Sequence, residues 1–493
     1  MNQIKPSLFR ELKRYSLENV KDVLGCKSEE AKQYLNTLRK YGIVKLVKKN
    51  SPDFSDMTND DLLIADSAED VSGACYKFDF VGVAAVKDRV FFSYPKYVAD
   101  GSDKEKELKF AIKAIRKYDA NGELVHLHNH DDKTEHNKLA LALHILQDYF
   151  DNGIYTNYQE IIETNGEGEI DWDRTINETF AYLKDNHPYY LELKTISSQS
   201  DDFDYFKRLH ECVVTQCSEY LDKLSLLDLF DIPQVLLSEQ ELKDFGDTDY
   251  ILYRLEREIA SQFVTRKQNL LKTLYTFVAE SGTEAQENSY SLYGTNCMNL
   301  VWENACGEIF GNEYGNLKNQ IPQPRWYFGD SSDPIKTDTL IPDIVTSFAY
   351  EDYSEVFCIL DGKYYLIQTN GSNISGNPGV QDVVKQFVYH KAFMRYIQEQ
   401  KFAAVLNGFL FPECEMLDLP NEVDLTGNIR IIGRITMMDW GKKSSDGQKM
   451  ETLVPIFLIF LKPSFVWDAY IQGSQRKDEL VTALKKYNFF EEL

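Results

Sequence analysis

The chain has 493 residues, of which 43% are hydrophobic and 13% aromatic, and it carries a formal net charge of −24 at pH 7. The length predicts about three domains with packed cores, and the acidic charge argues against a general nucleic-acid binder. No apolar run approaches the roughly 20 residues of a membrane span, and the amino terminus has no apolar signal region, so no membrane association is expected. The eight cysteines include no C-x-x-C pair, which predicts a reducing, cytoplasmic setting without structural zinc or a disulfide framework.

The first fifty residues are basic, with twelve Lys or Arg against five Asp or Glu. A first helix is predicted between Ser16 as its N-cap and Gly25 as its stop, and a second between Ser28 and Gly42. The alternating run I-V-K-L-V-K that follows predicts a short strand. Helix, tight turn, helix and wing are the order of a winged-helix DNA-binding domain over residues 1–50, whose second helix would contact a DNA groove. Its candidate contacts are Lys32, Gln33, Asn36, Arg39 and Lys40. A protein-docking winged helix and a solvated basic helix remain the alternatives.

A middle region of mixed strands and helices is predicted for residues 74–280. The preceding residues 50–73 are acidic and rich in turn formers, which indicates a linker or loop. Strand patterns run to residue 97, and the chain is predicted to be mostly helical from residue 105 onward. We expect this region to serve in partner docking or DNA recognition.

Two motifs of the middle region have competing interpretations. His126, His128 and His130 alternate, so a strand would place them on one face. No neighbouring ligand spacing matches a zinc module, and a polar loop is the preferred interpretation. The residues of the run G-E-I-D-W-D-R-T match no catalytic arrangement. The alternation of Ile170 with Trp172 predicts a packed strand or turn. Partner docking is the alternative for this run.

The clearest chemical signal lies further along, where Asp343 and Asp361 each stand in apolar, β-prone sequence. Residues 341–348 and 355–367 are two such runs joined by a short polar turn, which predicts a hairpin. Asp343 and Asp361 would then meet across the strand pair. Because alternate side chains of a strand share a face, Asp361 and Lys363 point the same way. The glycine between them points to the other face, where it is tolerable.

Two carboxylates and a lysine held in this way suit metal-assisted hydrolysis of a phosphodiester. Mg²⁺ prefers oxygen ligands and is commonly held by one or two carboxylates together with substrate phosphate. A bound metal lowers the pKa of its water and stabilises charge on the phosphoryl oxygens. Lys363 would lie beside the attacking water or the phosphate as a compact charge. The alternative is a hairpin with a polar tip, since Asp and Gly are common turn residues.

Two flanking helices add polar residues to this predicted site. The helix expected at 298–310 carries Glu303 beside its apolar face, from which a carboxylate can complete a metal site directly or through water. The helix expected at 379–396 presents a polar strip on one face. The members of this strip are Asp382, Lys385, Gln386 and Tyr389. Gln386 is the candidate for orienting the water or the lysine. For both helices a solvated polar face is the alternative.

In order and residue type these elements resemble the PD-(D/E)xK nuclease superfamily. More narrowly, the chain resembles the LlaJI family of restriction endonucleases, which is related to the McrC nuclease subunit of McrBC-type systems. The supporting segments are F-V-G-V-A-A-V, S-Y-P-K-Y at 93–97, G-E-G-E-I-D-W-D-R-T-I at 166–176, R-L-H at 208–210, V-W-E at 301–303 and D-G-K-Y-Y at 361–365. The resemblance implies an α+β multidomain fold with an N-terminal winged helix and a C-terminal PD-(D/E)xK α/β nuclease domain over residues 285–493. The resemblance also implies the site residues, with Mg²⁺ bound by Asp343, Asp361 and Glu303. Lys363 and Gln386 would be further catalytic residues.

The sequence contains no G-x-x-x-x-G-K-[ST] phosphate loop, so the chain is not itself an NTP-driven motor. The relatives work with a separate GTP-hydrolysing AAA+ subunit of the McrB kind, which the resemblance implies as a partner. We therefore predict a Mg²⁺-dependent endonuclease subunit of a phage-defence restriction system, acting on double-stranded DNA beside cognate cytosine methyltransferases. Two alternatives remain. One is a non-catalytic DNA-binding or regulatory subunit with a degenerate nuclease fold, and the other is a McrC-like modification-dependent nuclease whose target is chosen by the motor.

Overall fold

A computed structural model describes most of the chain. The described residues are 4–48, 74–120, 137–156, 158–185, 187–200, 204–281, 290–329, 333–351, 354–369, 374–414, 427–437 and 453–489. The acidic linker predicted at 50–73 and the histidines at 126, 128 and 130 lie outside these residues.

Inter-residue contacts divide the chain into two compact units. Unit 1 contains residues 1–5 and 133–291, and unit 2 contains residues 6–132 and 292–493. The segment predicted to bind DNA therefore shares unit 2 with the segment predicted to be the nuclease. The division into a DNA-binding domain, a middle region and a nuclease domain remains a prediction.

The helical segment near the start of unit 2 has the predicted order of elements. Helices α1 (Leu17–Leu24) and α2 (Ser28–Lys40) precede strand β3 (Val44–Lys48). Ser16 caps α1 as predicted, because its hydroxyl accepts a hydrogen bond from the backbone N–H of Asn19 at 3.1 Å. Ser28 is the first residue of α2 and not its cap, and α2 has no side-chain cap. Strand β3 pairs with β4 (Ala74–Phe78), which also pairs with β2 (Arg14–Tyr15).

Strand β1 (Ser7–Arg10) ties this segment into a second sheet of unit 2. The sheet has the order β1-β6-β5-β12, and β1 runs parallel to β6. Its other strands are β5 (Val81–Val86), β6 (Arg89–Tyr94) and β12 (Tyr290–Thr295). The alternating runs predicted as strands before residue 97 are confirmed.

Glu11, Lys96 and Tyr364 form a buried polar cluster directly after β1. Glu11 Oε2 accepts hydrogen bonds from the backbone N–H of Lys96 at 3.0 Å and from Tyr364 Oη at 2.7 Å. Lys96 Nζ lies 4.5 Å from the centroid of the Tyr364 ring. Burial raises the pKa of Glu11, and the charge of Lys96 opposes that shift. The cluster joins three distant parts of the sequence, one of which directly follows Lys363.

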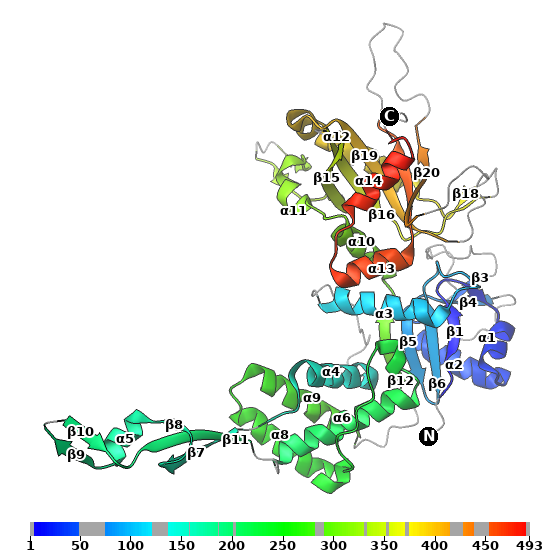
Figure 1. The fold of residues 1–493 in the computed structure, drawn as a ribbon. Helices are drawn as coiled ribbons and strands as arrows, with labels where there is room; N and C mark the ends of the chain where they lie inside the picture. Colours follow the sequence, from blue (N-terminus) through cyan, green and yellow to red (C-terminus); the bar gives the residue numbers. More distant parts are fainter. Residues whose placement is uncertain are drawn as a thin grey trace, which may run out of the picture. The chain divides into compact units, whose positions relative to one another are not determined.

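A five-stranded sheet of unit 2 holds the strands predicted to carry catalysis, in the order β15-β16-β19-β21-β20 (Figure 1). Its strands are β15 (Ile344–Glu351), β16 (Ser354–Gly362), β19 (Ala404–Pro412), β20 (Ile429–Ile435) and β21 (Ile456–Leu461). β15 and β16 pair antiparallel, so the predicted hairpin is confirmed, with the second strand ending at Gly362. β19 pairs parallel with both β16 and β21, and β20 pairs antiparallel with β21.

Helices cover this sheet on both faces. Helix α12 (Val380–Gln400) connects β16 to its parallel neighbour β19, as such crossovers require. Its aromatic residues pack with Phe357 and Ile359 of β16. Helix α10 (Met298–Ile309) approaches the other face, at Gly362. Since side chains alternate along a strand, Asp361 shares the α12 face with Phe357 and Ile359.

Further helices of unit 2 surround α10. Helices α3 (Lys104–Ala120) and α13 (Pro463–Gln472) pack against it, and the rings of Trp302 and Trp467 meet edge to face at 5.4 Å. The remaining elements of the unit are α11 (Tyr314–Leu317), a 3-10 turn (Lys318–Gln320), β13 (Arg325–Trp326), β14 (Ile335–Lys336), β17 (Gln368–Thr369), β18 (Ile374–Ser375) and α14 (Lys477–Lys486).

Unit 1 is built mainly on helices. They are α4 (Lys138–Asn152), α6 (Tyr205–Lys223), α7 (Leu227–Phe230), a 3-10 helix (Leu242–Phe245), α8 (Thr248–Ser261) and α9 (Thr265–Ser281). His210 is buried in α6, where its Nδ1 accepts a hydrogen bond from the backbone N–H of Tyr155 at 3.0 Å. Burial lowers the pKa of His210 to about 4, so it is a neutral structural residue at physiological pH. Within the described part of the chain, no helix has the length and apolar character needed to cross a bilayer.

The prediction of a mostly helical course from residue 105 is wrong between residues 158 and 200. This stretch forms β7 (Tyr158–Thr164), β8 (Glu169–Ile170), α5 (Trp172–Glu178), β9 (Ala181–Lys184), β10 (His187–Tyr190) and β11 (Lys194–Ser200). The predicted packing of Ile170 and Trp172 is also wrong, since Trp172 is 55% exposed. Asp171 explains the local turn, because its carboxylate caps α5 by accepting from the backbone N–H of Arg174 at 3.0 Å.

Candidate active site

Asp343 and Asp361 stand opposite each other at the end of the β15–β16 pair. The last ladder pair is Ile344 with Leu360, so the next residue on each strand is an aspartate. Asp361 is 1% exposed, and its carboxylate contacts the ammonium group of Lys363. Burial, and to a smaller extent the neighbouring Asp343 carboxyl, raise the pKa of Asp361 to about 8. Two facing carboxylates repel each other when both are ionised, so this site is suited to a cation.

Lys363 lies beside this pair on the same face of the chain. Its Nζ is 3.1 Å from Asp361 Oδ1 and 3.3 Å from Asp382 Oδ1. Burial alone would lower the pKa of Lys363, but the charges of Asp361 and Asp382 outweigh it, and the pKa is raised. The lysine therefore stays protonated and keeps a positive charge next to the carboxylates.

Glu303 reaches the same region from α10, which passes unusually close to β16. A Cβ atom placed on Gly362 would lie 3.0 Å from Glu303 Cα, so a larger residue there would require α10 to shift by a few tenths of an ångström. The glycine thus lies on the face opposite Asp361 and Lys363, where α10 comes close to β16. Burial raises the pKa of Glu303 to about 7, with a smaller contribution from Asp361 and an opposing one from Lys363.

Substitution of Gly362 by alanine tests this close approach. We expect Gly362→Ala to lower the free energy of unfolding by about 1–3 kcal/mol, because α10 must move away from β16 or strain its backbone. Urea unfolding followed by circular dichroism measures the change. Gly315→Ala is the matched control, since a Cβ there meets no atom within 4 Å. An equal effect of both substitutions would contradict the interpretation.

Gln386 is fully buried between α12 and the sheet, and its described contacts are with the strands. Its Nε2 donates hydrogen bonds to the backbone carbonyl of Ile359 at 2.9 Å and to Asn407 Oδ1 at 2.8 Å. Tyr389, three residues along α12, donates its hydroxyl to the backbone carbonyl of Ile341. These bonds tie α12 to β16, to β19 and to the segment just before β15. A role for Gln386 in orienting water remains a prediction.

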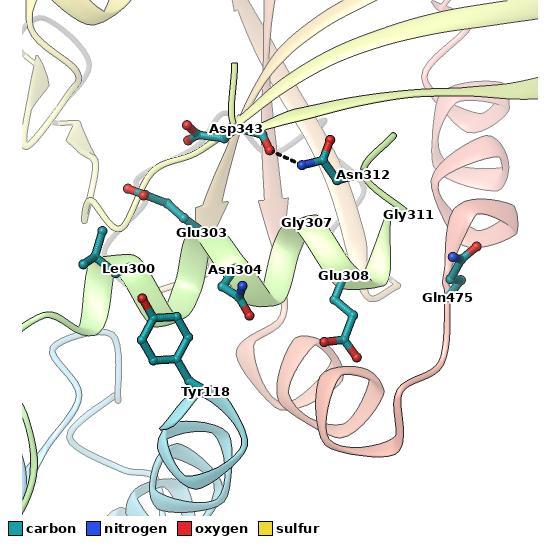
Figure 2. A pocket seen from close by; sticks show the side chains of 10 residues that line it. All are labelled: Tyr118, Leu300, Glu303, Asn304, Gly307, Glu308, Gly311, Asn312, Asp343 and Gln475. Atoms are coloured by element: carbon teal, nitrogen blue, oxygen red, sulfur yellow. Dashed lines mark hydrogen bonds between the residues drawn. The ribbon is translucent and has the colours of Figure 1, made fainter. Parts of the chain in front are cut away.

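A cleft of about 550 Å³ opens beside Asp343, along α10 (Figure 2). Glu303 points from α10 toward Asp343, whereas Asn304 and Glu308 point away (Figure 2). The other lining residues are Tyr118, Leu300, Gly307, Gly311, Asn312 and Gln475. Asn312 was not predicted as a site residue, because it follows α10 in a turn and only the folded chain brings it to Asp343.

The chemistry of these donors fits Mg²⁺. Asp343 and Asp361 offer hard oxygen ligands that face each other at the end of the strand pair. No group of three or more His, Cys, Asp or Glu side chains suited to a metal occurs among the described residues. The geometry thus offers two carboxylates, a number that Mg²⁺ commonly uses while keeping several waters. The assignment of Glu303 as a third ligand remains a prediction.

The five residues predicted to contact DNA all lie on α2, but they differ in exposure. Gln33, Asn36 and Lys40 are exposed, whereas Lys32 and Arg39 are half-buried. Lys32 Nζ lies 3.5 Å from Glu29. Gln33, Asn36 and Lys40 are therefore the better placed candidates for contact with a partner.

The comparisons with known proteins place the chain in a class and then in a family. The class is that of restriction endonucleases, since the LlaJI restriction endonuclease model matches residues 80–437. This match covers most of the chain, and the protein belongs to the LlaJI restriction endonuclease family. The resemblance inferred from its motifs is confirmed.

One curated relative and two solved structures are similar to the chain. The type II restriction enzyme BsuMI component YdjA of Bacillus subtilis (strain 168) is 29% identical over 384 residues, which are 76% of this chain and 79% of that protein. A chain of the half-complex of Thermococcus gammatolerans McrB AAA+ hexamers with bound McrC has a TM-score of 0.38 at 12% identity, covering 95% of this chain and 99% of its own. A chain of the Thermococcus gammatolerans McrBC complex has a TM-score of 0.23 at 16% identity, covering 61% and 85%.

Proposed function

We propose that this chain is a Mg²⁺-dependent endonuclease subunit of a restriction system and that it hydrolyses phosphodiester bonds of double-stranded DNA. The observation that carries the proposal is the buried Asp361, which faces Asp343 across the strand pair and contacts Lys363. Membership of the LlaJI family and similarity to a component of a type II restriction enzyme support it. In this proposal the five-stranded sheet β15-β16-β19-β21-β20 and its helices form a PD-(D/E)xK nuclease domain. Residues 1–50 would supply a DNA-binding winged helix.

Each residue of the site has a distinct task in the proposed reaction. Asp343 and Asp361 would hold Mg²⁺, which supplies an activated water and stabilises charge on the phosphate. Lys363, protonated between Asp361 and Asp382, would stabilise the negative charge that develops on the phosphoryl oxygens. Glu303 has a pKa of about 7, so at neutral pH it can accept or give up a proton at the mouth of the cleft.

We further propose that a separate GTP-hydrolysing AAA+ subunit drives the DNA past this site. The chain has no phosphate loop of its own, and the relative YdjA is named as one component of an enzyme. Cognate cytosine methyltransferases would protect the host DNA. Cleavage of plasmid DNA by the purified chain with its motor, with and without Mg²⁺, tests the proposal, and cleavage independent of any divalent cation would contradict it.

The exposed face of α2 is the proposed DNA contact. We expect Lys40→Ala to weaken binding about equally on all sequences and to reduce the slope of log Kd against log salt by about 1, because one phosphate contact is lost. Fluorescence anisotropy of labelled duplexes with the full chain at several salt concentrations measures both. Lys223→Ala, an exposed lysine of α6, serves as the control. Unchanged salt dependence in Lys40→Ala would remove α2 from the interface.

Recognition of a specific DNA sequence would require α2 to contact bases as well as phosphates. Gln33 and Asn36 have amide groups suited to base edges, and a lost base contact costs about 1–3 kcal/mol. We therefore expect Asn36→Ala to lose affinity for the cognate site by more than for random duplex DNA. Equal losses on both duplexes would assign α2 to the phosphate backbone alone.

A further inference from the structure

We propose that Asn312 is a positioning residue for Asp343, the proposed metal-binding carboxylate, because its side chain binds the main chain at Asp343 and Val345. The inference rests on the proposed function, since it concerns how the two aspartates present their oxygens to Mg²⁺. It adds a residue that neither the sequence motifs nor the carboxylate pair points to.

The side chain of Asn312 makes two hydrogen bonds of opposite sense to the backbone of residues 343–345, where β15 begins. Its Nδ2 donates to the backbone carbonyl of Asp343 at 2.7 Å, the bond drawn in Figure 2. Its Oδ1 accepts from the backbone N–H of Val345 at 3.0 Å. The same oxygen accepts from the backbone N–H of Tyr314 at 3.0 Å, which holds the amide itself in place. One donor and one acceptor on neighbouring residues fix the amide orientation.

Asp343 needs such a restraint because it lies just beyond the β15–β16 ladder. The ladder ends with Ile344 and Leu360, so no cross-strand pair with Asp361 holds the Asp343 backbone. The direction of its Cα–Cβ bond, and hence the separation of the two carboxylates, depends on contacts from outside the hairpin. Upstream, Tyr389 and Gln323 hold the carbonyls of Ile341 and Leu340. Asn312 bonds to the backbone carbonyl of Asp343 itself.

The structure also separates this positioning role from a role in holding the fold. The backbone N–H of Glu313 donates to the carbonyl of Val345 at 2.7 Å, so the main chain would keep β15 in place without the Asn312 side chain. Asn312 is exposed, and its removal leaves no buried cavity. Loss of the amide should therefore loosen Asp343 while the sheet stays intact.

The test uses the full chain with Asn312→Ala and measures metal binding directly. We expect isothermal titration with Mg²⁺, and with Ca²⁺ as a non-catalytic probe, to show affinity weakened by about tenfold, as for other groups that orient metal ligands. Metal-free DNA affinity and the melting temperature without metal should match the wild type. Cleavage should recover as the Mg²⁺ concentration is raised. Gln475→Ala, another amide of the same cleft, should bind Mg²⁺ normally.

Two outcomes overturn the inference, and a third bears on the proposed function instead. Unchanged Mg²⁺ affinity in Asn312→Ala, or equal weakening in Gln475→Ala, would show that the amide does not position Asp343. If Asn312→Ala fails to fold, Asn312→Ser replaces it, since its shorter hydroxyl cannot bond to both backbone groups, and the same loss of affinity is required. Normal Mg²⁺ binding by Asp361→Asn would overturn the proposed metal site, whatever Asn312 does.

Discussion

The Asp361→Asn chain is expected to lose DNA cleavage by about a thousandfold or more while it still folds and binds DNA. A bound metal contributes several kcal/mol to stabilising the charge of the transition state, and each 1.36 kcal/mol is a factor of ten in rate. The substitution preserves shape but removes the charge that would hold the cation. Initial rates on supercoiled plasmid, with DNA affinity and thermal melting measured in parallel, check this result.

Asp338→Asn is the matched control for that experiment. Asp338 is an exposed aspartate shortly before Asp343 in the sequence. The Asp338→Asn variant should cleave DNA at the wild-type rate. Normal cutting by Asp361→Asn would overturn the catalytic assignment and favour a non-catalytic DNA-binding or regulatory subunit. A joint loss of cleavage, DNA binding and the melting transition would instead indicate a misfolded protein.

The stability of the metal-free protein should depend on pH through Asp361. Its pKa is about 8 in the folded chain, against an ordinary value of 3.8. Between these values the unfolded chain has lost the proton while the folded chain still holds it, so the free energy of unfolding falls as pH rises. Above about pH 8 this contribution no longer changes. The total is on the order of a few kcal/mol, and Glu303 adds to it between its ordinary value of 4.5 and about 7.

Mg²⁺ should oppose this trend, because metal binding requires the ionised carboxylates and releases the proton. We expect Mg²⁺ to raise the melting temperature more at pH 8 than at pH 6. Chemical denaturation of wild-type and Asp361→Asn chains across pH 5–9 measures the effect, and the difference between them isolates Asp361 from the other acidic residues. A constant difference across this range would contradict the raised pKa.

The central part of the site could be predicted because it depends on local pattern. Two β-prone runs with a short turn define a hairpin, and the period of two along β16 puts Asp361 and Lys363 on one face. The observed register then brings Asp343 opposite Asp361. None of these steps requires knowledge of how distant segments pack.

The remaining features depend on packing between distant segments. The close approach of α10 to Gly362, the bonds of Asn312 to Asp343 and the burial of Gln386 all join parts of the chain far apart in sequence. The strands between residues 158 and 200 were missed because many of their side chains are exposed, including Leu183 of β9 at 76%. Exposed strands lack the alternation of apolar and polar residues on which strand prediction depends.

The Glu11–Lys96–Tyr364 cluster bears on how target specificity can change in this protein. If residues 6–48 were exchanged for the corresponding segment of another enzyme, Tyr364 and the backbone N–H of Lys96 would lose the carboxylate that accepts their hydrogen bonds. Buried hydrogen-bonding groups without a partner lower the free energy of unfolding. Strand β6 would also lose its parallel partner β1. The segment therefore cannot be exchanged as an independent module. If α2 contacts DNA as proposed, new specificities would arise more readily by point substitutions on its exposed face, with Glu11 retained.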